Sequence, residues 1–375
     1  MPSSRPPTPA PESDTAPQMR NTLATTLRAA LHLPSVIAQR CVHDHIHTAR
    51  CRACVEACPL EAWVIDDERL GIDINACDGC GLCVPACPEG AIFSNNALAD
   101  TDFRSWKSHP AIFRACERSD LDTADCRIPC VHSVGMRELL HHYPQGMTTW
   151  IITTADCDTC PRGRVQRLAE SVRQANALLQ SRSLEPIALV TLEPAQWKKI
   201  LNQSIPYQTG PISTRRDFFR DALRTVVKTT REVAAPTEDQ PAHFIAPTAW
   251  LPDGPSAVAL HSPVIDPLRC NGCDGCVRLC PHQAITLETT PVEPCYRIES
   301  RHCTGCGICR DVCDQNAVAI VTLQAPPQKT VPLAVTHCPA CAIRYHLPTA
   351  RFQPHGLCPI CAKTRHGRHL YQVLK

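Results

Sequence analysis

Cysteines recur in this chain at spacings that suit metal ligands. Residues 77–88 follow the pattern C-x2-C-x2-C-x3-C-P, with thiols at Cys77, Cys80, Cys83 and Cys87. Three thiolates two residues apart can close over one face of a cubane-shaped cluster if the loop is tight, and the fourth cysteine is carried onward to a neighbouring cluster. Zinc knuckles come instead as two separate C-x2-C pairs. The spacing therefore favours a 4Fe–4S cluster over zinc.

The pattern returns three more times along the chain. Two copies keep all four cysteines, although only the earlier of them keeps the final proline. They comprise Cys270, Cys273, Cys276 and Cys280, and then Cys303, Cys306, Cys309 and Cys313. The third additional copy is altered and retains Cys51, Cys54 and Cys58. The four copies form an internal repeat of two pairs, at residues 41–98 and 263–325.

These two stretches resemble the bacterial dicluster ferredoxins. In that family, the first three cysteines of one run share a cluster with the last cysteine of the other. The resemblance implies three regular 4Fe–4S sites, formed by Cys270, Cys273, Cys276 and Cys313, by Cys303, Cys306, Cys309 and Cys280, and by Cys77, Cys80, Cys83 and Cys58. Glycine amides in the runs are expected to donate hydrogen bonds to cluster sulfurs. These glycines are Gly79, Gly81, Gly272, Gly275, Gly305 and Gly307.

The altered copy leaves three interpretations open. Its expected first ligand position holds Thr48, and the nearest upstream cysteine is Cys41, with nine residues between it and Cys51. A longer loop can still deliver a thiolate, so the preferred ligand set is Cys41, Cys51, Cys54 and Cys87. A three-cysteine 3Fe–4S site would instead leave Cys41 free. A histidine ligand is the third interpretation, because histidines serve in other iron–sulfur centres. The candidates are His43, His45 and His47, and for each of them a solvated loop is the favoured interpretation.

The segment 103–205 differs in kind and predicts a small parallel α/β domain. Strands are expected at 111–117, 127–131, 148–155 and 186–192, alternating with helices at 134–143, 164–180 and 194–203. Cysteines follow three of the strands, and the carboxyl ends of parallel strands form one edge where ligand sites gather. Cys116, Cys130, Cys157 and Cys160 are therefore expected to form a four-thiolate site for 2Fe–2S or zinc. Cys126 precedes its strand and is the spare.

Two lines of this segment, 124–140 and 148–160, resemble the small iron–sulfur subunit of methyl-viologen-type hydrogenases and related heterodisulfide-reductase parts. In that family a strand–Cys–helix–strand–Cys-x-x-Cys pattern holds a 2Fe–2S cluster. The resemblance therefore implies a cluster at the same four cysteines. The alternative is a remnant fold with buried free cysteines.

The last part of the chain carries two Cys-Pro-x-Cys knuckles with sixteen residues between them. Cys338, Cys341, Cys358 and Cys361 have zinc-ribbon spacing, which gives a closed tetrahedral site. Rubredoxin uses the same knuckles for iron, so both metals stay open. A basic tail could make the ribbon a docking or nucleic-acid-binding unit, through Arg365, His366, Arg368 and Lys375. The lack of interleaved aromatic residues favours a structural cap instead.

These signals predict an α+β multidomain chain with two dicluster ferredoxin-like modules, a small parallel α/β domain between them and a C-terminal zinc ribbon. The expected parts are a disordered N-terminus and short helix (1–40), module 1 (41–98), the α/β domain (103–205), a charged helix with a Pro/Ala linker (206–262), module 2 (263–325) and the zinc-ribbon-like domain (335–375). The short helix is expected at 19–32 and the charged helix at 213–232.

Composition narrows the location and the partners. The chain has 375 residues, 26 cysteines and a net charge of +2. Cysteines grouped as ligands, with neither a leader peptide nor a membrane-length apolar stretch, predict a cytoplasmic protein. The near-neutral charge argues against a nucleic-acid partner. No dinucleotide fingerprint, P-loop or nucleophile triad is evident, so no catalytic residue and no small-molecule substrate are expected.

The leading hypothesis is therefore an iron–sulfur relay that passes single electrons between redox enzyme subunits, such as those of a dehydrogenase, a hydrogenase or a reductase. The first alternative is a redox sensor or maturation factor whose ribbon contacts nucleic acid or an apo-enzyme. The second makes the middle segment an active site that reduces a thiol or disulfide. That activity would require a reactive Cys126 or Cys130.

Overall fold

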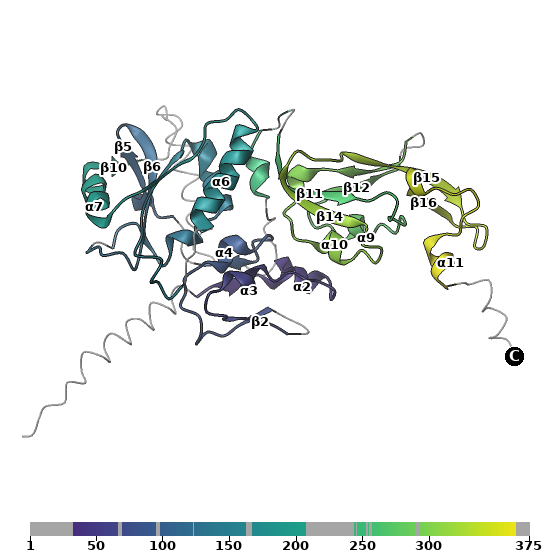
Figure 1. Cartoon of the computed structure of the whole chain (residues 1–375), viewed down its shortest axis with the longest axis horizontal. Helices are drawn as coiled ribbons and strands as arrows, with labels where there is room; N and C mark the ends of the chain where they lie inside the picture. The colour runs from purple at the N-terminus through teal and green to yellow at the C-terminus, as the bar shows by residue number, and fades with distance from the viewer. Residues whose placement is uncertain are drawn as a thin grey trace, which may run out of the picture.

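The computed structural model describes residues 33–66, 70–94, 98–122, 124–162, 167–207, 244, 246–252, 254, 257–289 and 293–364. Within these residues helices and strands are mixed throughout (Figure 1). The expected helices at 19–32 and 213–232, and the basic tail from residue 365 onward, lie outside the described residues.

The middle domain is built on a sheet with the strand order β10-β5-β6-β8-β9, and β7 also pairs with β6. Its strands are β5 (Phe103–Trp106), β6 (His109–Cys116), β7 (Arg127–Ile128), β8 (Thr149–Thr153), β9 (Ala188–Thr191) and β10 (Ile205–Pro206). Strands β6 to β9 correspond to the four expected strands, and their pairings are parallel.

Next to these parallel strands, one edge of the sheet is antiparallel, which the sequence did not predict. Strand β5 pairs antiparallel with β6, and β10 pairs antiparallel with β5. The cause is a two-residue hairpin at Lys107 and Ser108, whose φ angles of 49° and 65° are both left-handed. Two successive left-handed residues form the tight turn that matches strand twist. Because Lys-Ser replaces the usual Asn-Gly, this turn has little signature in the sequence.

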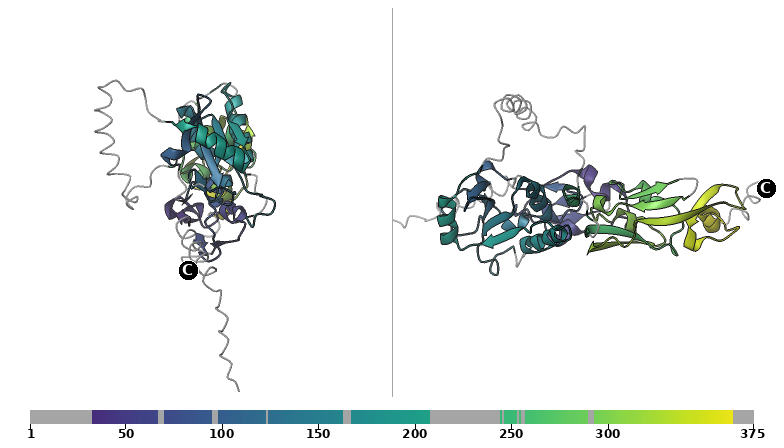
Figure 2. Two further views of the ribbon diagram at one scale, coloured as in Figure 1. Left: turned by 90° about the vertical axis from the view of Figure 1, so that its left-hand side faces the viewer. Right: turned by 90° about the horizontal axis from the view of Figure 1, so that it is seen from above.

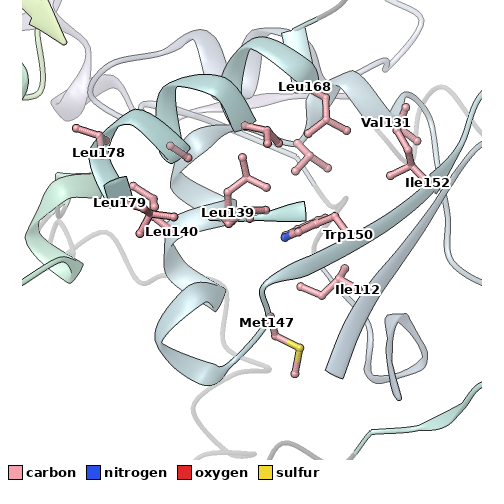
Figure 3. Close-up of a cluster of buried hydrophobic side chains, with 14 of the residues drawn as sticks. Ile112, Val131, Leu139, Leu140, Met147, Trp150, Ile152, Leu168, Leu178 and Leu179 are labelled. Atoms are coloured by element: carbon pink, nitrogen blue, oxygen red, sulfur yellow. The ribbon is translucent and has the colours of Figure 1, made fainter. Parts of the chain in front are cut away.

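Helices cover both faces of this sheet. Helices α5 (Met136–His142) and α6 (Arg167–Gln180) pack on one face, and α7 (Pro194–Gln203) packs on the other through Trp197. Figure 3 shows the hydrophobic core between the sheet and helices α5 and α6, where Trp150 and Ile112 of the sheet face leucines of the two helices. Each fully buried leucine contributes about 1.5–3 kcal/mol. The expected helices are therefore present and supported by a substantial core.

The first cysteine-rich module consists of short elements around a small core. Strand β1 (Ser35–Val36) pairs with β4 (Ile92–Phe93), and β2 (Trp63–Ile65) pairs with β3 (Leu70–Ile72). Its helical turns are η1 (Ala38–Arg40), α2 (Val42–His45), α3 (Ala53–Ala57) and α4 (Cys83–Ala86). Trp63 and Ile92 pack directly against cysteines. A core this small ordinarily depends on bound metal for stability.

The second module repeats this plan with longer strands. Strand β11 (Ala259–Ile265) pairs with β14 (Val318–Gln324), and β12 (Ile285–Glu288) pairs with β13 (Cys295–Ile298). Its helices are α9 (Gly275–Arg278) and α10 (Ile308–Asp311). Strand β15 (Thr330–His337) then adds to β13, and β16 (Arg344–Pro348) adds to β15. The C-terminal knuckles, which end in α11 (Pro359–Thr364), are thus joined to the second module by one continuous sheet.

The parts follow one another along an elongated molecule. Figures 1 and 2 show the middle domain at one end and β15 and β16 at the other, with α2, α3 and α4 running below α6 toward the second module. Short 3₁₀ turns complete the chain, at η2 (Asp100–Asp102), η3 (Val131–Ser133), η4 (Tyr143–Gln145), η5 (Pro247–Trp250), η6 (Ser300–His302) and η7 (Thr349–Arg351). In the described part of the chain, every helix is too short or too polar to cross a membrane.

Replacing Leu139 by alanine should destabilise the middle domain by about 2–5 kcal/mol, because it deletes a fully buried side chain beneath α6. Ile205→Ala is the matched control. Its side chain is 65% exposed at the edge of the same sheet, so a change within about 0.5 kcal/mol is expected. Urea unfolding of the full chain, followed by tryptophan fluorescence, measures both. Equal losses for the two variants would contradict this account of the core.

Candidate iron–sulfur and metal sites

Both sites of the first module are cavities lined by four cysteines drawn from both of its runs. The regular site is lined by Cys58, Cys77, Cys80 and Cys83, together with Leu60, Trp63 and Gly81. Cys58 follows α3 from the altered run, whereas Cys83 begins α4. The structure therefore brings together the set that the resemblance to dicluster ferredoxins implies.

The irregular site lies beside it and is lined by Cys41, Cys51, Cys54 and Cys87. Cys41 lies between η1 and α2, and α2 begins the loop that leads on to Cys51. His43 also lines the cavity, but its ring nitrogen donates to the backbone oxygen of Cys51 at 2.8 Å. His45 and His47 are exposed and do not line it. Cys41 is thus the fourth cysteine that lines this cavity.

The second module has the same two groupings. Cys280, Cys303, Cys306 and Cys309 line one cavity with Ile285, Ile308 and Ile320. Cys270 and Cys276 lie close enough to both Cys273 and Cys313 that the charges of their thiolates would interact. Cys273 is exposed, whereas Cys270 and Cys276 are buried. In each group the last ligand again comes from the other run.

The last cysteine of every run is followed by the same turn. The residue three positions on has a left-handed φ between 47° and 55° and donates its N–H to the cysteine carbonyl. The next residue is a buried alanine whose N–H donates to the cysteine sulfur at 3.2–3.4 Å. The four pairs are Cys58 and Ala62, Cys87 and Ala91, Cys280 and Ala284, and Cys313 and Ala317. Such donors stabilise a thiolate ligand and tune its cluster.

Sequence reasoning missed these alanines, although the signal was present as Cys-x3-Ala in all four copies. The sequence instead predicts that glycine amides donate hydrogen bonds to the cluster sulfurs. Three of those donate to the cysteine two residues earlier, from Gly79 to Cys77, from Gly272 to Cys270 and from Gly305 to Cys303. These glycines have φ between 72° and 81°. A Cβ on Gly272 would lie 2.1 Å from the carbonyl oxygen of His346, so only glycine fits there.

Burial keeps these thiols neutral unless a metal compensates. Desolvation raises the pKa of Cys54, of Cys83 and of Cys309 to about 12, and it also raises the pKa of Cys80 and Cys276. Iron ions would supply the positive charge that such buried thiolates need, in exchange for their protons. Four converging thiols, largely apolar walls and N–H donors aimed at sulfur fit an iron–sulfur cluster.

The middle domain holds a further four-cysteine cavity. Cys116, Cys130, Cys157 and Cys160 line it together with Val131, His132 and Arg162. Cys116 ends β6, Cys130 follows β7, and Cys157 and Cys160 lie in the loop after β8, so the carboxyl edge of the sheet does bring them together. Cys126 is absent from this lining and is buried elsewhere, and its S–H donates to the carbonyl of Thr101.

Two polar residues of this site escaped sequence reasoning. The ring nitrogen Nε2 of His132 lies 3.6 Å from the sulfur of Cys157. The buried guanidinium of Arg162 binds Asp78 at 2.6 Å and Glu117 at 2.7 Å, and it donates to the carbonyl of Pro129. Asp78 belongs to the first module, so Arg162 ties the two cavities together. No local pattern could reveal a contact that spans 84 residues.

The C-terminal knuckles form a compact four-sulfur group. The sulfur atoms of Cys338, Cys341, Cys358 and Cys361 all lie within 4.8 Å of one another. The backbone N–H of Cys358 donates to the sulfur of Cys338 at 3.4 Å, which lowers the pKa of Cys338. The described part of the chain contains all 26 cysteines, and none of them forms a disulfide.

Comparison with known proteins identifies the two cysteine-rich modules. Models of the 4Fe-4S dicluster domain match residues 49–92 and residues 269–317. A tetrathionate reductase subunit of Archaeoglobus fulgidus is 45% identical over 51 residues, which are 13% of this chain and 25% of that protein. A ferredoxin of Streptomyces griseus is 36% identical over 74 residues, 20% of this chain and 62% of that protein.

A further relative, the ferredoxin 7Fe of Hydrogenibacillus schlegelii, is 32% identical over 57 residues, which are 15% of this chain and 68% of that protein. The chain thus spans from a quarter to about two thirds of the length of these relatives. Most of its own length lies outside the matched segments.

Gly272→Ala should cost the chain the iron and sulfide of one cluster, because the new Cβ would collide with the carbonyl of His346 at a left-handed backbone position. Gly275→Ala is the matched control, three residues further on in the same cysteine run. There the nearest atom to the new Cβ is 3.7 Å away, so the metal content should be unchanged. Iron and acid-labile sulfide per chain measure the difference, and full retention by Gly272→Ala would refute it.

Proposed function

The chain belongs to the ferredoxins that carry 4Fe-4S dicluster domains, and we propose that it relays single electrons between redox enzymes through four 4Fe–4S clusters and a fifth cysteine site. The observation that carries this proposal is the pairing of runs, in which the last cysteine of each run joins the first cysteines of its partner. One matched relative is by name a reductase subunit. A reductase or dehydrogenase is accordingly the proposed kind of partner.

The proposed ligand sets follow the four cysteine groups of the two modules. They are Cys58, Cys77, Cys80 and Cys83; Cys41, Cys51, Cys54 and Cys87; Cys280, Cys303, Cys306 and Cys309; and Cys270, Cys273, Cys276 and Cys313. A bound cluster would supply reversible one-electron chemistry at each set. The chain's own part is to hold the sulfurs apart from water and to aim N–H groups at them, as at Ala62 and Ala91.

The middle domain is proposed to hold a 2Fe–2S cluster at Cys116, Cys130, Cys157 and Cys160. Its support is the convergence of four sulfurs on one cavity, with Nε2 of His132 lying 3.6 Å from the sulfur of Cys157. The knuckles are proposed to bind zinc, because four sulfurs within 4.8 Å of one another suit a closed tetrahedral site. Their sheet contact with the second module supports a structural cap.

Cys157→Ser combined with Cys160→Ser should remove one iron–sulfur signal and leave the other four. EPR redox titration with iron, sulfide and zinc analysis measures this, and the same analysis should find one zinc per chain. Cys295→Ser is the matched control, since Cys295 lies on β13 outside every cysteine group and contacts Glu288. If the double variant kept the full spectrum, the middle site would have to be dropped.

Cys41→Ser should convert the irregular site from a 4Fe–4S to a 3Fe–4S cluster, because three cysteines remain around the cavity. One relative is by name a 7Fe ferredoxin. Seven iron atoms correspond to one 4Fe–4S and one 3Fe–4S cluster, so that relative is a suitable comparison for this variant. EPR of oxidised, anaerobically prepared protein measures the 3Fe signal. A 3Fe signal already present in the unaltered protein would contradict the assignment of Cys41.

A further inference from the structure

Glu89 is a buried carboxylate between the two modules. It follows Cys87, a proposed ligand of the irregular site, by two residues and is 4% exposed. Both its oxygens are bound by side chains of the second module. His282 donates through Nε2 at 2.7 Å, and the hydroxyl of Thr304 donates to the other oxygen. A buried carboxylate is stable only when its oxygens are satisfied in this way.

The two partners of Glu89 flank ligands of one particular site. Thr304 directly follows Cys303, and His282 lies two residues after Cys280. Both cysteines line the same cavity of the second module. The hydrogen bonds therefore link the irregular site of the first module to one defined site of the second.

Apolar packing supports the same contact. Val42 and Ile46 from the first module bury against Ile308 of α10, with Cys51 and Cys306 packed around them. Alongside, the backbone N–H of Arg50 donates to the carboxylate of Asp311 at 2.9 Å. Sulfur ligands of the two sites thus flank one shared hydrophobic cluster.

We propose that Glu89 is a positioning residue that holds the Cys41, Cys51, Cys54 and Cys87 site against the Cys280, Cys303, Cys306 and Cys309 site. This inference rests on the proposed function and adds a route to it. An electron that leaves one of these sites reduces the other, so one oxidation balances one reduction and no bond is made or broken. Redox partners at the ends of the series supply and remove the electron.

With this junction, the five cysteine sites form one series. The middle site adjoins the regular site of the first module, since Cys80, Leu82 and Cys130 pack together and Arg162 bridges Asp78 to the carbonyl before Cys130. Within the second module, Cys276 and Cys309 share one core. The electron route would therefore run from the middle domain to the site of the exposed Cys273 without leaving the protein.

The test uses the full chain reduced with sodium dithionite. Glu89→Ala should keep the iron and sulfide content of the unaltered protein. It should lose the EPR spin–spin interaction between the modules, so that only interactions within each module remain. Amide hydrogen exchange at 42–46 and 307–311 should become at least about tenfold faster. In both readouts the Glu89→Gln variant should fall between the unaltered protein and Glu89→Ala, because its amide carbonyl can still accept a hydrogen bond from Thr304.

Glu288→Gln is the control for loss of a carboxylate, since Glu288 pairs with Arg297 at the surface of the second module. It should change neither readout. If Glu89→Ala loses iron, the Ile46→Asp variant is tested by the same two readouts. It places a charge in the apolar contact between the modules, at a side chain that is not itself a proposed ligand. Ile74→Asp is its control, at a side chain that is 61% exposed.

The outcomes separate this inference from the proposed function. Unaltered spin–spin interaction and exchange in an iron-replete Glu89→Ala or Ile46→Asp variant would overturn the junction while leaving the clusters in place. A lack of iron and sulfide in the unaltered protein would instead overturn the proposed function itself.

Discussion

The convergence of four thiols on one small cavity is the constraint on which the rest of this structure depends. Desolvation raises the pKa of Cys54 and Cys309 to about 12, so these sulfurs cannot carry charge without a compensating cation. The first module has little else to bury, apart from Trp63, Ile92 and their neighbours. Metal binding and folding are therefore expected to be coupled in this module. Its loops place the sulfur atoms close together and bury little apolar surface.

Much of this could be predicted from the sequence, because it is local. Cysteine spacing indicated the runs, and the resemblance to dicluster ferredoxins implied the groups of four that line the cavities of the two modules. Strand endings indicated the group in the middle domain. Contacts between distant segments could not be predicted. Glu89 meets Thr304 across 215 residues and Arg162 meets Asp78 across 84, and no periodicity encodes either pair. The antiparallel edge of the sheet was missed because its Lys-Ser turn lacks glycine.

The repeated turn after each run shows how local chemistry is reused. A left-handed residue precedes a buried alanine in every copy, yet the left-handed residue is glutamate, glycine, glutamine or asparagine. The conformation is held by hydrogen bonds to the cysteine carbonyl and sulfur, not by glycine alone. The altered copy keeps this turn at Cys58 and Ala62. Its departure from the pattern is therefore confined to the start of the run.

That departure has a structural consequence. A regular run has only two residues between its first two cysteines, whereas nine separate Cys41 from Cys51. The additional length forms α2 and supplies Val42 and Ile46, which are the side chains that pack against Ile308 of the second module. A two-residue loop has no room for such a contact. The irregular loop thus delivers a sulfur to its own site and also provides the surface that meets the other module, which explains why the altered copy lies at the junction.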